Sequence, residues 1–313
     1  MLQFKISVCR LPTGSRASIV AAAGFSVVCW AYAPIGIHVA LTRYAPLELA
    51  ALRFALASMV LGAIVLVRRR LDPIAWKDLG WLCRLACFGV VLHHMALNLG
   101  QRSVSAGAAS TLAQSTPLFT AWLAARVGGE ALNRCQITAM VLAASGAGCV
   151  VVSGGPMYAS WLGGGAILGA ALSWAVYFTL LRTHAHRLDG LSCTCYTVWL
   201  GTALLFGLFA ATRRGDVEHA WHGSPDADIA LLLLGVFPSA LAYWSWAHVL
   251  RHVPAGRASV ALYLVPPAAI LLAMALLGER PSPGVIAGMV AILAGVALVA
   301  RSAPARRARV PSH

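Results

Sequence analysis

The sequence predicts an all-α membrane protein with ten transmembrane helices, arranged as two inverted five-helix repeats. Three observations lead to this prediction: an apolar composition, ten apolar segments long enough to span a bilayer, and an internal repeat. Of the 313 residues, 59% are hydrophobic and 11% are charged, whereas a soluble domain carries about 25% charged residues. This composition excludes a disordered chain and argues against an ordinary soluble fold.

The formal net charge is nevertheless +14. A basic chain can indicate a nucleic-acid partner, but a chain with so few charged residues has no room for a broad basic face. In membrane proteins, by contrast, positive charges gather in the cytoplasmic loops. The placement of the charges along the chain therefore decides between these two interpretations.

Ten segments meet the requirement of about 20 mostly apolar residues for a membrane-spanning helix. Basic residues precede the first segment, as in a signal peptide, but nine more segments follow it, so we expect a retained helix. Residues 17–153 would form the first repeat and residues 161–301 the second. The segments are 17–38, 46–67, 80–101, 105–126, 135–153, 161–181, 191–211, 229–248, 256–277 and 282–301.

The charges give the expected orientation. With a cytoplasmic N-terminus and alternating helices, 18 Lys and Arg residues fall on the cytoplasmic side and five outside, while Arg53 lies within the second helix. The opposite orientation would violate the positive-inside rule. We therefore expect a multi-pass protein of the bacterial inner membrane with both termini in the cytoplasm.

An internal repeat relates residues 106–130 to residues 255–279. At a constant offset of 149, nine of the 25 positions are identical, among them Pro117 with Pro266 and Glu130 with Glu279. Five helices per half is an odd number, so the second copy enters the membrane from the opposite side. Inverted repeats of this kind are typical of secondary transporters.

The chain resembles the EamA type of the drug/metabolite transporter superfamily over about residues 17–301. The resemblance rests on the Ala-Gly-x-Ala-Ser, Pro and Gly-Glu pattern in both repeats, and on PLELAALRFALA at 46–57. It implies export or exchange of small metabolites through a cavity between helices 1–4 and 6–9, with helices 5 and 10 at the periphery. The second repeat lacks an equivalent of Arg53-Phe54, so the symmetry of the repeats does not support a functional role for Arg53.

Polar side chains within a bilayer are costly and mark functional sites. His94, Asn98 and Gln101 share one helical face by their spacing, whereas His93 should point elsewhere. The repeat offset pairs His94 with Tyr243. We predict a substrate-binding set that also uses aromatic residues from both halves: Trp30, Arg53, His94, Asn98, Gln114, Trp174, Tyr177, Tyr243, Trp246 and Tyr263.

Structural roles compete with this prediction. Trp and Tyr often anchor helices at the bilayer interface, and Ser, Thr and Gln often join helices. Arg53 could extend to the interface or pair locally, or it could bind an anionic group of the substrate. Both interpretations of Arg53 stay open at this point.

Pro117 and Pro266 predict matched kinks in the fourth and ninth helices, because proline removes a backbone hydrogen bond. We expect these kinks to help gating, and static bends are the alternative. We expect Glu130 and Glu279 to orient the connections that follow them rather than to carry protons. No Asp or Glu lies mid-membrane, so proton antiport through a histidine and uncoupled exchange are both open.

The expected partners are a small-molecule substrate and the lipid bilayer, with no nucleic acid and no cofactor or metal; a homodimer is one option for the assembly. The chain has no GxxxxGK[ST] loop, so it does not drive transport with ATP on its own. We expect no enzymatic activity. The alternatives are a membrane-embedded enzyme and a non-transporting sensor. The predicted topology argues against a metalloenzyme, because it places the histidine pairs on opposite sides of the membrane.

Overall fold

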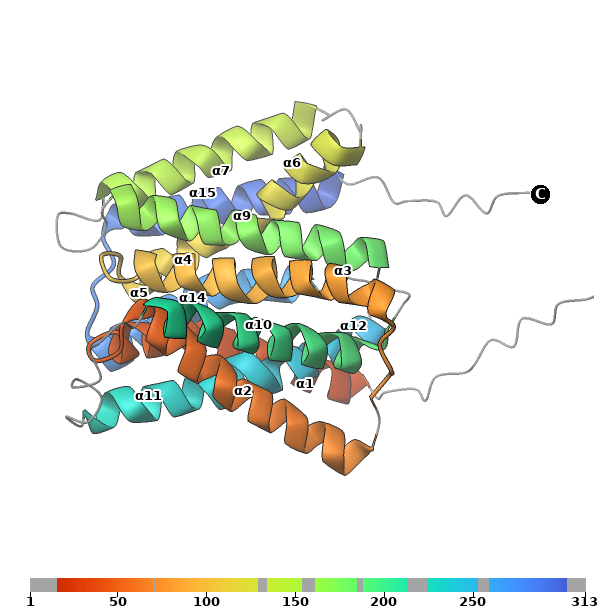
Figure 1. Ribbon diagram of the computed structural model, residues 1–313. Helices are drawn as coiled ribbons and strands as arrows, with labels where there is room; N and C mark the ends of the chain where they lie inside the picture. Colours follow the sequence, from red (N-terminus) through yellow and green to blue (C-terminus); the bar gives the residue numbers. More distant parts are fainter. Residues whose placement is uncertain are drawn as a thin grey trace, which may run out of the picture.

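A computed structural model describes residues 16–69, 71–128, 134–153, 161–184, 188–212, 224–252 and 259–302, and these residues form helices without a strand (Figure 1). The helices of the first half are α1 (Arg16–Ala40), α2 (Pro46–Arg68), α3 (Trp76–Ala86), the π-helical turn η1 (Cys87–Leu92), α4 (His93–Gly100), α5 (Ala106–Ala113), α6 (Thr116–Gly128) and α7 (Arg134–Ser153). Those of the second half are α9 (Trp161–His184), α10 (Gly190–Thr212), α11 (Pro225–Val236), the π-helical turn η2 (Phe237–Leu241), α12 (Ala242–His252), the 3₁₀ helix η3 (Ser259–Leu264), α14 (Val265–Leu277) and α15 (Pro283–Ser302).

Several of these helices have the length and composition of membrane spans. Among the described residues, six apolar helices of 21–25 residues qualify, and three shorter apolar helices lie at Ile137–Ser153, Ala261–Leu277 and Pro283–Leu298. The prediction of an all-α chain with several membrane-spanning helices is confirmed. The count of ten remains a prediction.

The segment 105–126 is not the single helix that its hydropathy suggested. It is divided into α5 and α6 by a turn at Gln114 and Ser115. Pro117 has no N–H, and its ring disfavours the helical conformation of the preceding turn. In the second half, the 3₁₀ helix η3 precedes α14, which begins one residue before Pro266. The two segments therefore change their helical geometry at repeat-equivalent positions.

The internal repeat extends over the whole pattern of helices. The bounds of α6 and α7 recur in α14 and α15 with a shift of 149 residues, and those of α2 recur in α10 with a shift of 144. The shift changes because the connection after α10 is five residues longer than the one after α2. The duplication thus includes the first two helices, where sequence identity is low.

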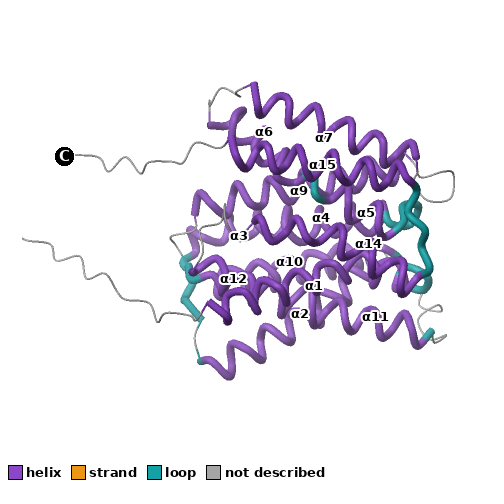
Figure 2. The backbone as a smooth tube through the Cα atoms, turned by 180° about the vertical axis from the view of Figure 1, so that it is seen from behind, coloured by secondary structure: helices purple, strands orange, loops and turns teal. Residues whose placement is uncertain are grey.

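The packing of the helices is reciprocal between the halves. Helix α4 packs on α9 and its counterpart α12 packs on α1, while α6 packs on α9 and α14 packs on α1. Helices α2 and α10 pack on each other, as do α7 and α15. Figures 1 and 2 show α7 and α15 on one side of the bundle, with α2 and α11 on the other, and α1 and α9 running in opposite directions.

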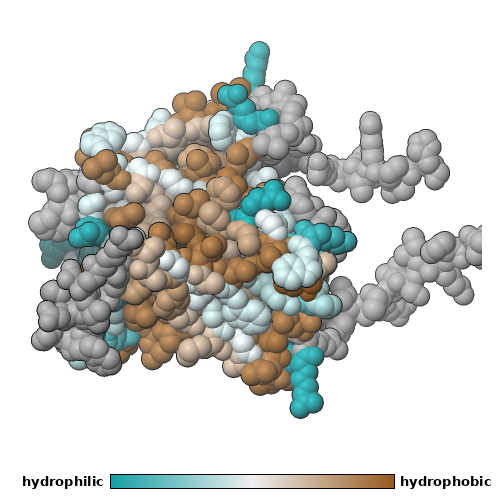
Figure 3. Space-filling model, viewed as in Figure 1, coloured by the Kyte–Doolittle hydropathy of each residue, from teal (hydrophilic) through white to brown (hydrophobic). Residues whose placement is uncertain are grey.

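The surface is that of a protein in lipid. Large apolar side chains such as Leu66, Val67 and Leu162 point outward. In Figure 3 hydrophobic residues cover the middle of the visible face, and hydrophilic ones lie toward the helix ends. A soluble monomer rarely exposes apolar surface on this scale.

Small residues allow a close approach between α7 and α15. A Cβ atom added to Gly146 would lie 2.8 Å from the carbonyl oxygen of Gly288 and 2.9 Å from Cβ of Ala291. Glycine contacts of this kind bring membrane helices close enough for extensive van der Waals packing. The contact between these two helices therefore depends on the absence of a side chain at Gly146.

We predict that Gly146→Ala destabilises the protein, because the added methyl group overlaps backbone of α15. Overpacking costs about 1–3 kcal/mol, and it should lower the melting temperature of the purified protein in detergent. The control is Gly148→Ala on the same helix, where an added Cβ meets nothing within 4 Å. Equal melting temperatures for the two variants would contradict the close packing.

Candidate functional site

An aromatic cluster occupies the centre of the bundle, between the two halves. The ring of Trp174 on α9 lies 4.5 Å from His93, 4.9 Å from Tyr177 and 5.9 Å from Tyr243, measured between ring centroids. His93 belongs to α4 in the first half, and Tyr243 to α12 in the second. The cluster therefore joins residues that are far apart in the sequence but meet at the interface of the repeats.

Trp30 on α1 extends this cluster toward α12. Its ring lies 5.4 Å from Trp246 and 6.0 Å from Tyr243, and its Nε1 donates to the carbonyl of Pro238 at 3.3 Å. Trp30 and Trp174 occupy equivalent positions on the first helix of each half. The two tryptophans, which are equivalent in the repeat, thus both pack against Tyr243 in the aromatic cluster.

His93 points to another side of the helix than His94, as the spacing predicts. Its ring stacks on Trp174, and its Nδ1 donates to the carbonyl of Ala170 at 2.9 Å. His94 turns instead toward Phe54 on α2, with 4.6 Å between ring centroids. The π-helical turn Cys87–Leu92 lies immediately before these histidines, and such turns, frequent at functional sites, break the regular helical spacing.

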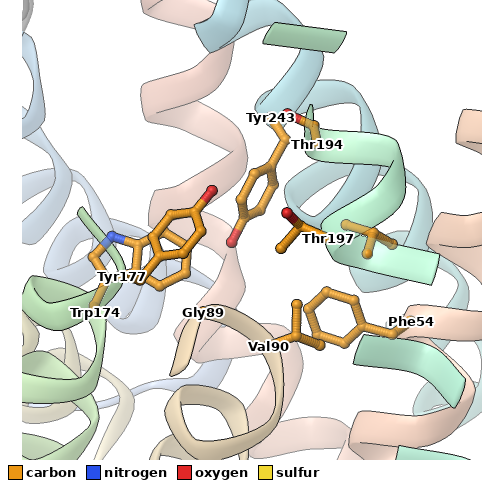
Figure 4. A pocket seen from close by; sticks show the side chains of 9 residues that line it. Phe54, Gly89, Val90, Trp174, Tyr177, Thr194, Thr197 and Tyr243 are labelled. Atoms are coloured by element: carbon orange, nitrogen blue, oxygen red, sulfur yellow. The ribbon is translucent and has the colours of Figure 1, made fainter. Parts of the chain in front are cut away.

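A small cavity lies within this cluster (Figure 4). Its volume is about 10 Å³, which is room for about one water molecule. Figure 4 shows the hydroxyl group of Tyr243 directed into the space between the Trp174–Tyr177 pair and Phe54. The cavity is lined by Phe54, Gly89, Val90, Trp174, Tyr177, Thr194, Thr197, Val198 and Tyr243.

Polar groups without partners lie in and beside this cavity. Arg53 is 2% exposed, its Nε donates to Oγ of Ser239 at 2.5 Å, and its Nη1 has no hydrogen-bond partner among the described residues. Both ring nitrogens of His94 and the hydroxyl of Thr197 are also unpartnered there. Buried polar atoms are seldom left unsatisfied, so this group of atoms is suited to bind a polar ligand.

Three of the predicted site residues lie apart from the aromatic cluster. Asn98 is fully buried and donates from Nδ2 to the carbonyl of Pro46 at 3.0 Å, which links α4 to the start of α2. Gln114 ends α5. The Tyr263 hydroxyl donates to the carbonyl of Val296 on α15 at 3.2 Å. Gln101, on the same face as Asn98, donates to the carbonyl of Pro34 at 2.8 Å.

The structure also adds residues that the sequence did not identify. Thr197 occupies the position on α10 that Arg53 occupies on α2, so extending the repeat to these helices would have found it. Ser239 and Gly89 gave no such signal. A Cβ atom on Gly89 would lie 2.5 Å from the ring of Tyr177, so glycine is required for the aromatic ring to approach the helix.

The two ends of the bundle differ. At the end where α5 begins, the carboxylate of Glu279 accepts hydrogen bonds from the backbone N–H groups of Ala106 at 2.8 Å and Gly107 at 3.2 Å. Arg43 and Tyr44 both bond Asp228 there. Burial, followed by this hydrogen bond, raises the pKa of Tyr44 to about 12, so the phenol remains a donor at neutral pH. These contacts join the connection after α14 to α5, and the connection after α1 to α11.

A second cavity, of about 420 Å³, lies between α1, α2, α10 and α12 toward the opposite end of the bundle, within the size range of ligand pockets. Arg68 borders it with its guanidinium 4.8 Å from the ring centroid of Trp244. The residues lining it are Ala22, Phe25, Arg68, Leu191, Leu241, Trp244, Ser245 and His248.

Apolar helices in two reciprocally packed halves, with a buried polar site between them, define a multi-pass membrane protein of the transporter class. The EamA-like transporter family matches residues 17–152 and 161–301. The chain belongs to this family. The resemblance in the sequence is therefore confirmed, and the family indicates a transporter rather than an enzyme.

Similar proteins carry transporter names. The chain is 34% identical to a probable terminal-alkyne amino-acid exporter of Streptantibioticus cattleyicolor, over 90% of this chain and 93% of that protein. It is 28% identical to a probable amino-acid metabolite efflux pump of Salmonella typhimurium, over 86% and 90% of the two chains. A protein of known crystal structure shares the fold, with a TM-score of 0.62, 18% identity, and coverage of 91% of this chain and 97% of the other.

We predict that Gly89→Ala impairs the site without unfolding the protein. The added methyl group meets the ring of Tyr177 and must displace it from Trp174, so transport by cells that overproduce the variant should fall severalfold. Gly80→Ala on the preceding helix is the control, since an added Cβ there meets nothing within 4 Å. Normal transport at equal membrane levels would show that the position of the Tyr177 ring is unimportant.

Proposed function

We propose that this protein is a secondary transporter that exports or exchanges small metabolites, amino acids among them, by alternating access between two inverted five-helix repeats. The observation that supports this most strongly is the position of the aromatic and polar site, which is built from α1, α4, α9 and α12 at the interface of the halves. The names of the relatives favour amino acids or their derivatives as substrates. The predicted substrate-binding set and the possible homodimer stay part of this proposal.

The proposed topology has ten helices in the bacterial inner membrane and both termini in the cytoplasm. The start of α1 and the end of α15 lie at the same end of the bundle (Figure 1). Arg68, Lys77 and Arg84 belong to this end, and the positive-inside rule assigns it to the cytoplasm. The 420 Å³ cavity then faces inward, and the end held by Glu279 and Asp228 faces outward.

In alternating access, the inner end would close while the outer end, which is held by Glu279 and Asp228, would open. Repeat symmetry makes Glu130, Ala255 and Gly256 the counterparts of Glu279, Ala106 and Gly107, and these counterparts lie outside the described residues. We propose that they form the equivalent contact when the inner end closes. Inverted repeats can exchange conformations in this way. The breaks before Pro117 and Pro266 would let α5 and η3 move relative to α6 and α14, which is the proposed gating role of these prolines.

The experiment that tests the proposed function compares the metabolites in the culture medium of a deletion strain, an overproducing strain and a strain that overproduces Gly89→Ala. Export predicts metabolites that accumulate outside the overproducing cells and fall in the other two. Identical media would contradict transport and would favour a sensor or an enzyme.

We predict that Glu279→Ala opens the outer end. Hydrogen bonds to a charged group contribute about 1.5–3 kcal/mol each, and the carboxylate also stabilises the N-terminus of α5 through the helix dipole. With Ser110→Cys as a reporter in a background without other cysteines, an impermeant maleimide should label intact cells at least tenfold faster. Ser110 is buried on α5, and its hydroxyl has no partner among the described residues.

Two controls accompany this measurement. Arg280→Ala changes the exposed neighbour of Glu279 and should leave the labelling rate unchanged, and Glu279→Gln should give an intermediate rate because an amide oxygen still accepts hydrogen bonds. The same slow labelling in Glu279→Ala and in the parent protein would show that the carboxylate does not hold the outer end closed.

A further inference from the structure

Arg53 is a buried cation without a counter-charge. It lies seven residues into α2, is 2% exposed and has no ion pair with any described residue. Its interactions are the hydrogen bond to Ser239 and the neighbouring ring of Phe54, whose centroid is 5.7 Å from the guanidinium carbon. A buried charge that is not compensated is strongly unfavourable, and within a membrane it marks a functional position.

The fold holds the Arg53 guanidinium in one orientation. Pro238 cannot donate a hydrogen bond to the carbonyl of Leu234, and the hydroxyl of Ser239 donates to that carbonyl instead, at 2.8 Å. The Ser239 oxygen then accepts from Nε of Arg53. This leaves Nη1, on the other part of the guanidinium, without a partner.

The groups around Arg53 form two different surfaces. His94, which contacts Phe54, and Thr197 supply polar atoms that have no partner among the described residues. Tyr243, one helical turn after Ser239, contacts Trp174, with 5.9 Å between ring centroids. A ligand in this place would have a polar group near α2 and an apolar body near α9.

We propose that Arg53 is the counter-charge for a carboxylate of the transported molecule, and that the substrates are small amphipathic monocarboxylates. The planar guanidinium matches a carboxylate in a bidentate geometry. One negative charge neutralises one arginine, whereas a phosphate would leave excess charge in the buried site. This inference rests on the proposed transport function and identifies its substrate class.

The charge of Arg53 also favours exchange over net transport. When substrate is bound the pair is neutral, and when the site is empty the cation remains uncompensated while the helices rearrange around it. A ligand favours the conformations that it binds most tightly. A bound carboxylate should therefore stabilise the closed conformation in which Arg53 is buried. The loaded carrier therefore changes its conformation more readily than the empty one, and substrate on the far side accelerates efflux.

The first experiment compares the excreted metabolites of strains that overproduce the wild type, Arg53→Gln, Arg53→Lys and the surface control Arg102→Gln. We expect the wild type and Arg102→Gln to export compounds with a free carboxylate, Arg53→Gln to export roughly 10-fold to 100-fold less, and Arg53→Lys to retain part of the activity. Exported compounds without a carboxylate would overturn this inference and leave the transport function standing. No export by the wild type would overturn the transport function itself.

The second experiment needs no variant. Proteoliposomes containing the wild type and a radiolabelled carboxylate identified in the first experiment are diluted into buffer, unlabelled carboxylate, or its amide. We expect the carboxylate to accelerate efflux at least tenfold and the amide to have no effect. Equal acceleration by the amide would overturn the role of Arg53 as a counter-charge. Efflux into buffer alone at the rate seen with the carboxylate would overturn the preference for exchange.

The melting temperature separates this role from a structural one. Removing an unpaired buried charge should leave the melting temperature of Arg53→Gln equal to or above that of the wild type without ligand, while the substrate-induced increase disappears. A lower melting temperature with an unchanged substrate-induced increase would assign Arg53 to the scaffold.

Discussion

Buried backbone carbonyls require hydrogen-bond donors in a bilayer, and this requirement governs the centre of the structure. No water is available at that depth, so a break in helical geometry persists only where other groups satisfy the freed carbonyls. The π-helical turns η1 and η2 are such breaks. Ser173 on α9 donates to the carbonyl of Phe88 in η1, and Trp30 on α1 donates to that of Pro238 in η2. Each half thus supplies, from its first helix, the donor that the other half needs.

This reciprocal arrangement connects the packing to the site. The side chains that satisfy the π-helical turns are Trp30 and Ser173, which is the neighbour of Trp174. The donors therefore place both tryptophans against the turns that immediately precede the helices of the histidines and of Tyr243. The aromatic cluster follows from the way in which two duplicated halves satisfy each other's backbone. A site formed in this way lies at the interface whose rearrangement would expose it to either side of the membrane.

Much of the fold could be predicted from the sequence, because hydropathy, charge and duplication are properties that a chain displays directly. The contacts within the site were harder to predict from the sequence. The regular spacing of a helix placed His94, Asn98 and Gln101 on one face, and all three are buried, but Asn98 and Gln101 bond to the backbone of α2 and α1. The spacing also put His93 on another face, but it could not show that this face meets Trp174 on α9. The offset of 149 could not pair Arg53 with Thr197, because the extra residues between the second and third helices of the second half change the shift.

The difference between Arg53 and Thr197 shows where two symmetric halves had to diverge. Two arginines at equivalent positions would place two cations beside one cavity, where even Arg53 alone has no ion pair with a described residue. With threonine on one side, the site keeps a single charge and gains a neutral hydroxyl opposite it. The Glu279 contact, by contrast, lies at the end of the bundle, where a carboxylate on a helix N-terminus can form in both halves without a buried charge. The duplication can therefore retain symmetry at the two ends, where the halves must alternate, and lose it at the centre, where both halves share one ligand.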